Sequence, residues 1–324
     1  MRIHVHTRLA GPDFAITETH WRDATARAAE PAHAVTFGAT AAEWDAARDT
    51  ADLLVTDAHV LRALLPLSAP ALKLVFVTNA GVDGLAPFDW LPDGATLLNN
   101  SGTHAPKAGE FIAMALLMLA TRMPAMQTAQ CQGIWRPAFS PPLAGRRATI
   151  VGVGDLGGAG ARVLRHLGVG VTGVRARAAP HPDFDEVAGV DELDAVLARS
   201  EFVVLACPLT PSTLGLLDRR RLGLLPRGAG VVNIGRGRLL DQDALCDLLD
   251  SGHLSGAVLD VTTPEPLPEG HRMWRTPNLT ITPHVSCDDP DNYTARSLDI
   301  LFANLRALRA GGVPPNRVDT ARGY

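Results

Sequence analysis

An arginine, a carboxylate and a histidine each follow an apolar run in the second half of the chain. Arg236 follows VVNIG, Glu265 stands shortly after GAVLDV, and His284 follows LTITP. Arginine presents a planar fork to a carboxylate, and histidine exchanges a proton near neutral pH. A nearby glutamate orients the imidazole and favours its charged form. Together, the three side chains could bind an anionic carbonyl compound and protonate its oxygen.

Each of these residues also has a purely structural interpretation. Only two of the 30 basic residues are lysines, so a single arginine says little about function in this chain. Glu265 stands between two prolines, which is typical of a loop acid, and His284 could be a structural histidine. Their joint placement favours the functional interpretation, because the carboxyl ends of parallel strands meet at one edge of a sheet.

Residues 148–165, ATIVGVGDLGGAGARVLR, predict a strand, a tight glycine turn and a helix. The spacing Gly-x-Gly-x-x-Gly falls on Gly152, Gly154 and Gly157. The first glycine allows the turn, the second lets the backbone approach a pyrophosphate, and the third lets the helix pack closely on the strand. Phosphates would rest on the N–H groups at the start of the helix. The motif alone could equally be a simple turn, so its context must decide.

Apolar runs alternate with helix-like stretches, which predicts parallel sheets with helical crossovers. Before residue 100 the runs are 3–5, 53–55, 72–77 and 96–98. From residue 148 we expect about six strands, the number of a doubly wound dinucleotide fold. The run before the glycine turn is the first, and the others are 169–174, 201–206, 231–235, 256–261 and 279–283. A helix at 292–310 is expected to pack back on the first domain.

Composition limits the classes of protein to which the chain can belong. Its 324 residues are enough for roughly two domains, and a hydrophobic content of 46% is sufficient to form their cores. A formal net charge of -4 gives no reason to expect nucleic acid or an anionic membrane as a partner. The four cysteines show neither metal-ligand nor disulfide spacing, and the longest apolar run, 111–120, is too short to span a bilayer. We expect a cytoplasmic protein without a metal site.

Five ordered motifs resemble those of the D-isomer-specific 2-hydroxyacid dehydrogenase family, and the resemblance covers roughly residues 70–310. The motifs are GVGDLG at 152, ACPLTPST at 206, VVNIGRGRLLD at 231, GAVLDVTTPEPLP at 256 and WRTPNLTITPH ending at 284. The resemblance implies two Rossmann-like, doubly wound parallel-sheet domains of the α/β class. The expected segments are a flavodoxin-like substrate domain at 1–100, an NAD(P)-binding Rossmann domain at 101–287, and a C-terminal helix at 288–324 that returns to the discontinuous substrate domain.

The family's residue roles carry over to matching positions of this chain. Arg236 would anchor the substrate carboxylate and polarise the keto group, while Glu265 would pair with the catalytic His284. Backbone N–H groups of the loop Asn79, Ala80 and Gly81 would hold the carboxylate as well. Asp260 would hold the nicotinamide carboxamide. The full set of expected cofactor contacts is Gly152, Gly154, Asp155, Leu156, Gly157, Arg175, Arg177, Cys207, Pro208, Thr213, Ile234, Gly235, Arg236, Asp260 and His284.

Two departures from the family pattern bear on the prediction. NAD-using relatives carry an acid at the end of the second Rossmann strand, where this chain has Arg175, with Arg177 close by. An arginine there accommodates a 2'-phosphate, so NADP is the predicted cofactor and NAD remains possible. The residues after His284 are VSCDD rather than a small alanine and glycine run, which affects the floor of the pocket.

The sequence therefore predicts an NADPH-preferring 2-keto acid reductase, reversible as a D-2-hydroxyacid dehydrogenase, for a small substrate such as glyoxylate or hydroxypyruvate. A non-catalytic NAD(P)-binding sensor or corepressor on the same fold is the alternative. A methyltransferase would need an acid near the position of Arg175, and nothing points to formate or phosphite as a substrate. The helix expected at 106–122 is apolar on nearly every face, which predicts a homodimer.

Overall fold

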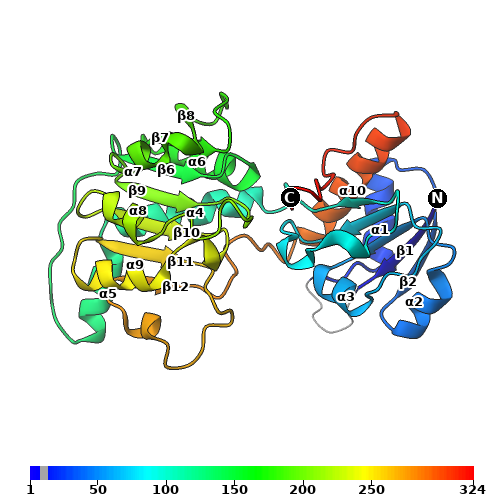
Figure 1. The fold of residues 1–324 in the computed structure, drawn as a ribbon, viewed down its shortest axis with the longest axis horizontal. Coiled ribbons are helices and arrows are strands. Elements are labelled where there is room, and N and C mark those ends of the chain that lie inside the picture. Colours follow the sequence, from blue (N-terminus) through cyan, green and yellow to red (C-terminus); the bar gives the residue numbers. More distant parts are fainter. Residues whose placement is uncertain (8–13) are drawn as a thin grey trace. The chain divides into compact units, whose positions relative to one another are not determined.

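The computed structural model describes residues 1–7 and 14–324, which divide into two compact units (Figure 1). The first unit comprises Met1–His104 and Asp288–Tyr324, and the second comprises Ala105–Cys287. Each unit contains one parallel sheet with helices against it. The predicted α/β fold with two doubly wound parallel sheets is confirmed.

The first unit has the strand order β2-β1-β3-β4-β5, a flavodoxin-like arrangement. Its strands are β1 (Arg2–His6), β2 (Ala34–Gly38), β3 (Leu53–Thr56), β4 (Leu74–Val77) and β5 (Thr96–Leu98), and its helices are α1 (Glu18–Ala28), α2 (Ala41–Ala47), α3 (Ala58–Ala63) and α10 (Tyr293–Arg309). Successive residues of a strand face opposite sides. Thus Leu53 packs in one core with Trp21 and Phe302, whereas Leu54 packs in another core with Trp44.

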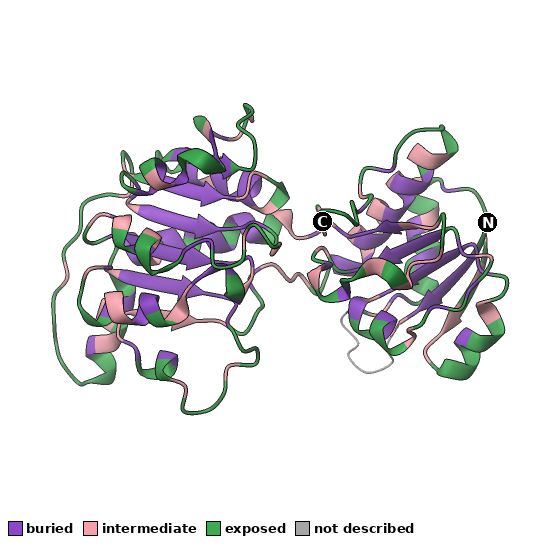
Figure 2. Ribbon diagram, viewed as in Figure 1, coloured by how far each residue is buried: buried purple, intermediate pink, exposed green. Residues whose placement is uncertain are grey.

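The second unit has the strand order β12-β11-β10-β9-β6-β7-β8. Its strands are β6 (Arg147–Val151), β7 (Gly170–Arg175), β8 (Glu186–Gly189), β9 (Phe202–Leu205), β10 (Gly230–Asn233), β11 (Gly256–Leu259) and β12 (Leu279–Ile281). Its helices are α4 (Ala105–Ala120), α5 (Met123–Cys131), α6 (Asp155–His166), α7 (Leu193–Leu197), α8 (Arg219–Leu224) and α9 (Gln242–Asp250). The central strands are buried on both faces, as Figure 2 shows. The carboxyl ends of β9, β10, β11 and β12 therefore come to one edge.

Seven strands form the sheet of the second unit, so the expected number of about six was too low. The missed strand, β8, has the sequence EVAG and lies at the sheet edge, where half of its positions stay partly or fully exposed. The edge strand β2 of the first unit also escaped prediction, because none of its residues is buried. Edge strands of this kind lack the apolar run by which central parallel strands are recognised.

The apolar helix expected at 106–122 ends at Ala120, where the chain turns into α5. Arg122 takes a left-handed conformation with φ 59°, and Pro124 lies in the first turn of α5. Among the described residues no single helix has the length and apolarity to cross a bilayer; α4 and α5 reach these only as a pair, bent by 67°. Met114 and Leu117 remain 42% exposed on one face of α4.

Candidate active site

The glycine turn joins β6 to α6 in a conformation that only glycine tolerates. Gly152 has φ +115°, and a Cβ there would lie 2.5 Å from the carbonyl oxygen of Ala206. A Cβ on Gly157 would lie 1.9 Å from the carbonyl oxygen of Gly152. A Cβ on Gly154, the residue that caps α6, would meet nothing within 4 Å. The space before the amides of the first helical turn is therefore open, and this cradle fits the pyrophosphate of a dinucleotide.

Arg175 ends β7, and both Arg175 and Arg177 are exposed. Neither side chain is paired with an acid among residues 1–7 and 14–324. Two nearby arginines of this unit are paired by contrast: Arg162 contacts Asp183 at 2.7 Å, and Arg199 contacts Glu186 at 2.7 Å. The end of β7 thus carries two uncompensated positive charges where the ribose of a dinucleotide lies in this fold.

The loop after β9 closes over the glycine turn. Gly235 approaches this loop so closely that a Cβ on Gly235 would lie 2.9 Å from the carbonyl oxygen of Cys207. Thr213 Oγ1 donates to the carbonyl of Pro208 and accepts from the Thr210 amide, both at 2.7 Å, which fixes the loop. Burial raises the pKa of the Cys207 thiol to about 11, so the thiol stays protonated at neutral pH. Its contact with the cofactor stays a prediction.

Arg236 lies three residues after the end of β10, and Ile234 between them is buried. Asn233 Nδ2 donates to the Arg236 carbonyl at 2.9 Å, and Asn233 Oδ1 accepts from the Gly235 backbone amide at 3.0 Å. The guanidinium donates to the Gly235 carbonyl at 2.8 Å. Arg236 is therefore fixed at the carboxyl edge of the sheet, beside the strand that precedes Glu265.

His284 and Glu265 form a pair in which Nδ1 lies 2.5 Å from Oε1. Both side chains are accessible, at 49% and 39% of their surfaces. His284 has φ 56°, and its amide donates to the carbonyls of Asp260 and Thr282 at 2.9 and 3.0 Å. Because Nδ1 faces the carboxylate, Nε2 is the nitrogen left to meet a substrate.

Asp260 has a role that the sequence did not indicate. Its buried carboxylate accepts from Thr282 Oγ1 at 2.6 Å, from the Val285 amide at 2.9 Å and from the Ser286 amide at 3.0 Å. These bonds hold the segment on both sides of His284. A carboxylate has about four acceptor positions, so little capacity remains for a further ligand. The contact with a nicotinamide carboxamide stays a prediction.

The loop after β4 belongs to the first unit, and its carbonyl groups from Thr78 to Ala80 are all engaged. The Thr78 carbonyl accepts from the Tyr293 hydroxyl and from Asn100 Nδ2, the latter at 2.8 Å. The carbonyl of Asn79 accepts from the Asn100 amide at 3.1 Å, and that of Ala80 accepts from Asn99 Nδ2 at 3.0 Å.

The amides of this loop are placed differently from its carbonyls. Asn79 Oδ1 accepts from the Ala58 amide at 2.7 Å, which ties the loop to α3. The amides of Ala80 and Gly81 donate to no acceptor among the described residues. Free amides beside satisfied carbonyls form a backbone site for an anion. The partners Asn99, Asn100 and Tyr293 were missed by sequence reasoning; the paired asparagines directly after β5 were the available signal.

Comparison with known proteins gives matches along most of the chain. Residues 113–286 match the family model described as D-isomer specific 2-hydroxyacid dehydrogenase, NAD binding domain. Glyoxylate/hydroxypyruvate reductase A of Serratia proteamaculans (strain 568) is 32% identical over 259 residues, which are 78% of this chain and 82% of the relative. Glyoxylate reductase of Korarchaeum cryptofilum (strain OPF8) is 30% identical over 271 residues, 81% of this chain and 79% of the relative.

Two solved structures extend the likeness. The D-isomer specific 2-hydroxyacid dehydrogenase from Xanthobacter autotrophicus Py2, in complex with NADPH and MES, aligns with a TM-score of 0.84 at 30% identity, covering 100% of this chain and 99% of that one. The NADPH-dependent glyoxylate/hydroxypyruvate reductase from Sinorhizobium meliloti, in complex with NADP and sulfate, aligns with a TM-score of 0.81 at 28% identity and the same coverage.

Proposed function

Because the chain belongs to the D-isomer specific 2-hydroxyacid dehydrogenase family, we propose that it is an NADPH-preferring reductase of small 2-keto acids such as glyoxylate or hydroxypyruvate. The predicted family and the predicted class, an NAD(P)-dependent oxidoreductase, are confirmed. The observation that carries the proposal is the accessible contact between His284 and Glu265 at the sheet edge that also bears Arg236.

Each of these side chains has one task in the reduction. When bound, the reduced nicotinamide supplies the hydride that reaches the keto carbon. His284 Nε2 donates a proton to the keto oxygen, and Glu265 holds Nδ1 and stabilises the imidazolium. Arg236 binds the substrate carboxylate and offsets the negative charge that develops on the oxygen. The amides of Ala80 and Gly81 are proposed to hold a carboxylate.

The preference for NADPH rests on the unpaired charges of Arg175 and Arg177. A 2'-phosphate is the group by which NADP differs from NAD, and a guanidinium binds phosphate through charge-assisted hydrogen bonds. The Xanthobacter and Sinorhizobium structures contain NADPH and NADP, which supports the assignment. NAD binds more weakly to the same cradle.

The proposed assembly is a two-fold homodimer. Met114 and Leu117 are exposed on α4, and the following segment exposes Trp135 at 96% and Phe139 at 89%. Apolar residues so exposed and so close in sequence are typical of a protein interface. Sedimentation velocity of wild type and Leu117→Glu tests this, since the charged variant should sediment as a monomer.

The other expected partners are small molecules. A formal net charge of -4 gives no basic surface for nucleic acid or an anionic membrane. We place the enzyme in the cytoplasm, where reduced nicotinamide is supplied. The thiols of Cys131, Cys207, Cys246 and Cys287 form no disulfide among the described residues, which suits a reducing compartment.

Assays of NADPH and NADH oxidation with a panel of 2-keto acids test the proposed function. Glyoxylate and hydroxypyruvate should be reduced, and NADPH should give the larger kcat/KM. His284→Ala is the matched control, because it removes the proton donor and leaves the glycine turn intact. Tight NADPH binding without reduction of any keto acid would favour the non-catalytic sensor instead.

A further inference from the structure

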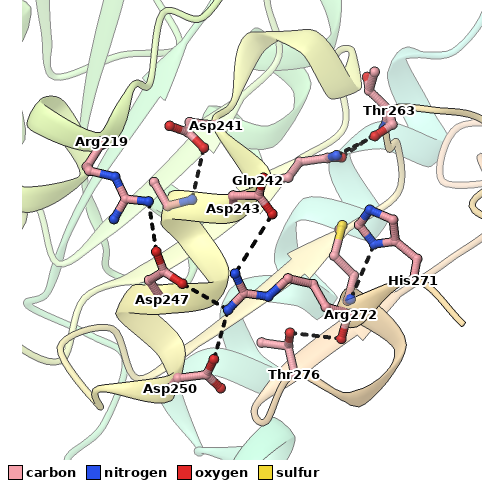
Figure 3. Close-up of polar contacts among 12 residues, drawn as sticks. Arg219, Asp241, Gln242, Asp243, Asp247, Asp250, Thr263, His271, Arg272 and Thr276 are labelled. Atoms are coloured by element: carbon pink, nitrogen blue, oxygen red, sulfur yellow. Dashed lines mark hydrogen bonds and ion pairs between the residues drawn. The ribbon is translucent and has the colours of Figure 1, made fainter.

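The segment that carries Glu265 leaves β11 and returns to β12, and it is fastened to α9 at two points. At the first, the carboxamide of Gln242 bonds both backbone groups of Thr263 (Figure 3). Its Nε2 donates to the Thr263 carbonyl at 2.6 Å, and its Oε1 accepts from the Thr263 amide at 2.8 Å. The Gln242 side chain therefore bonds the Thr263 backbone in the way that a neighbouring strand would. It fixes the backbone two residues before Glu265.

The second point is an ion-pair cluster on the same helix. Arg272 contacts Asp247 at 2.9 Å and Asp250 at 3.0 Å, and Arg219 contacts Asp247 at 2.8 Å from the other side (Figure 3). Arg272 begins the short 3-10 turn Arg272–Arg275, which leads the chain back toward β12. One helix thus holds both ends of the segment.

Between these two points most of the chain is exposed, although Leu267 packs against the core and the Pro268 carbonyl accepts from Trp274 Nε1 at 2.9 Å. Residues 263–266 and 268–270 are exposed and belong to no helix or strand. Within this stretch Glu265 reaches across to His284 Nδ1, and the Thr262 hydroxyl donates to the Pro264 carbonyl at 2.9 Å. The direction in which the Glu265 carboxylate points depends on where Thr263 is fixed.

We propose that Gln242 is a positioning residue for proton transfer: it sets the approach of Glu265 to His284 through its two bonds to Thr263, while Arg272 anchors the far end of the segment. This inference rests on the proposed roles of Glu265 and His284. A carboxamide suits the position because it donates and accepts at once, whereas a carboxylate would leave the Thr263 carbonyl without a donor.

Hydrogen–deuterium exchange tests the anchoring without any need for turnover. In Gln242→Ala the Thr263 amide loses its acceptor, so peptides covering residues 261–268 should exchange faster than in wild type. Ser251→Ala is the matched control, because Ser251 is exposed at the end of α9 and its hydroxyl donates to the Leu248 carbonyl. Unchanged exchange in Gln242→Ala would overturn the inference, whatever substrate the enzyme uses.

The kinetic arm separates positioning from general damage. Gln242→Ala should lower the reductive kcat about 10- to 100-fold with little change in the Kd for NADPH, and Gln242→Glu should lie in between. In a Glu265→Ala background the same Gln242→Ala change should alter kcat less than about twofold, because the group that it positions is gone. An equal loss in both backgrounds would mean a structural effect and overturn the inference. Failure of the proposed function is read separately, from a wild type that reduces no keto acid.

Discussion

The loop after β4 and the segment after β11 both carry groups proposed to act on one substrate, yet they are held in opposite ways. Around the first, backbone and side-chain donors of buried residues occupy every carbonyl from Thr78 to Ala80. The second is exposed and depends on a few bonds at its ends. Rigid backbone suits the recognition of a fixed carboxylate, while an accessible side-chain pair suits the exchange of protons with substrate and water.

The largest effect is expected when the proton donor is removed. His284→Ala should lower the reductive kcat by about 100- to 10,000-fold, since a positioned general acid contributes that much. The KM of the keto acid should change little, because the substitution leaves the residues proposed to bind its carboxylate unchanged. Steady-state kinetics with NADPH, beside a binding titration of NADPH, check this. A His284→Ala variant with a raised KM and an unchanged kcat would contradict this assignment, in which the loop after β4 binds substrate and the segment after β11 serves proton transfer.

Substitution of Arg175 in the proposed cofactor site should change the cofactor preference without affecting either loop. Arg175→Asp should abolish the preference for NADPH, since one charge-assisted bond of about 1.5 to 3 kcal/mol corresponds to about 10- to 100-fold. The new carboxylate should also favour the ribose hydroxyls of NADH and reverse the order. The ratio of kcat/KM for the two cofactors is the measurement, and Arg199→Ala, on an arginine paired with Glu186, is the control. An unchanged ratio would remove Arg175 from the site.

Arg236 is proposed to act both in substrate binding and in the chemical step, so its substitution should affect both. Arg236→Lys retains the charge but loses the planar fork, so kcat/KM should fall at least about tenfold. Both kcat and KM should contribute, because the guanidinium meets the carboxylate and the developing oxyanion. NADPH affinity should remain that of wild type. Wild-type kinetics in the lysine variant would contradict the assignment.

A milder change should affect only binding. Burial raises the pKa of Tyr293 to about 12, so its hydroxyl stays a donor to the Thr78 carbonyl at any working pH. Tyr293→Phe keeps the ring and removes about 1 kcal/mol of hydrogen bonding, so the KM of the keto acid should rise about fivefold while kcat is retained. A fall in kcat with unchanged KM would show that this loop is not a binding element.

Acid should destabilise the first unit more than the second. Burial, helped by the charge of His6 and opposed by that of Glu43, lowers the pKa of His4 from 6.5 to about 4, and burial also lowers the pKa of His6. The unfolded chain therefore binds more protons than the folded chain below pH 6.5. The contribution of neutral His4 and His6 to the free energy of unfolding is complete above pH 6.5 and is lost as the pH falls toward 4.

Urea unfolding at pH 7.5 and pH 5, monitored by exchange in each unit, measures the effect. His4→Phe should weaken the pH dependence of the first unit, whereas His166→Gln, on an exposed histidine of α6, should leave it unchanged. Equal pH dependence of both units would contradict the account.

The sequence was most informative where the physical requirement is local. A turn at φ +115° with a carbonyl 2.5 Å from any Cβ demands glycine at Gly152, and this requirement is readable from one motif. Central strands such as β9 and β10 are buried on both faces and appear as apolar runs. The ordered motifs also led to Arg236, Glu265 and His284, because their residue types and their places after strands carry the chemistry.

The tertiary structure alone decided which partners hold those residues. Tyr293 and Thr78 lie 215 positions apart in the chain, and Gln242 and Thr263 lie 21 apart. The Asp260 carboxylate is occupied by Thr282, Val285 and Ser286, which no spacing rule indicates. A hydrogen bond depends on distance and direction in space, and residues remote in sequence acquire both only when the strands and helices that bear them are packed.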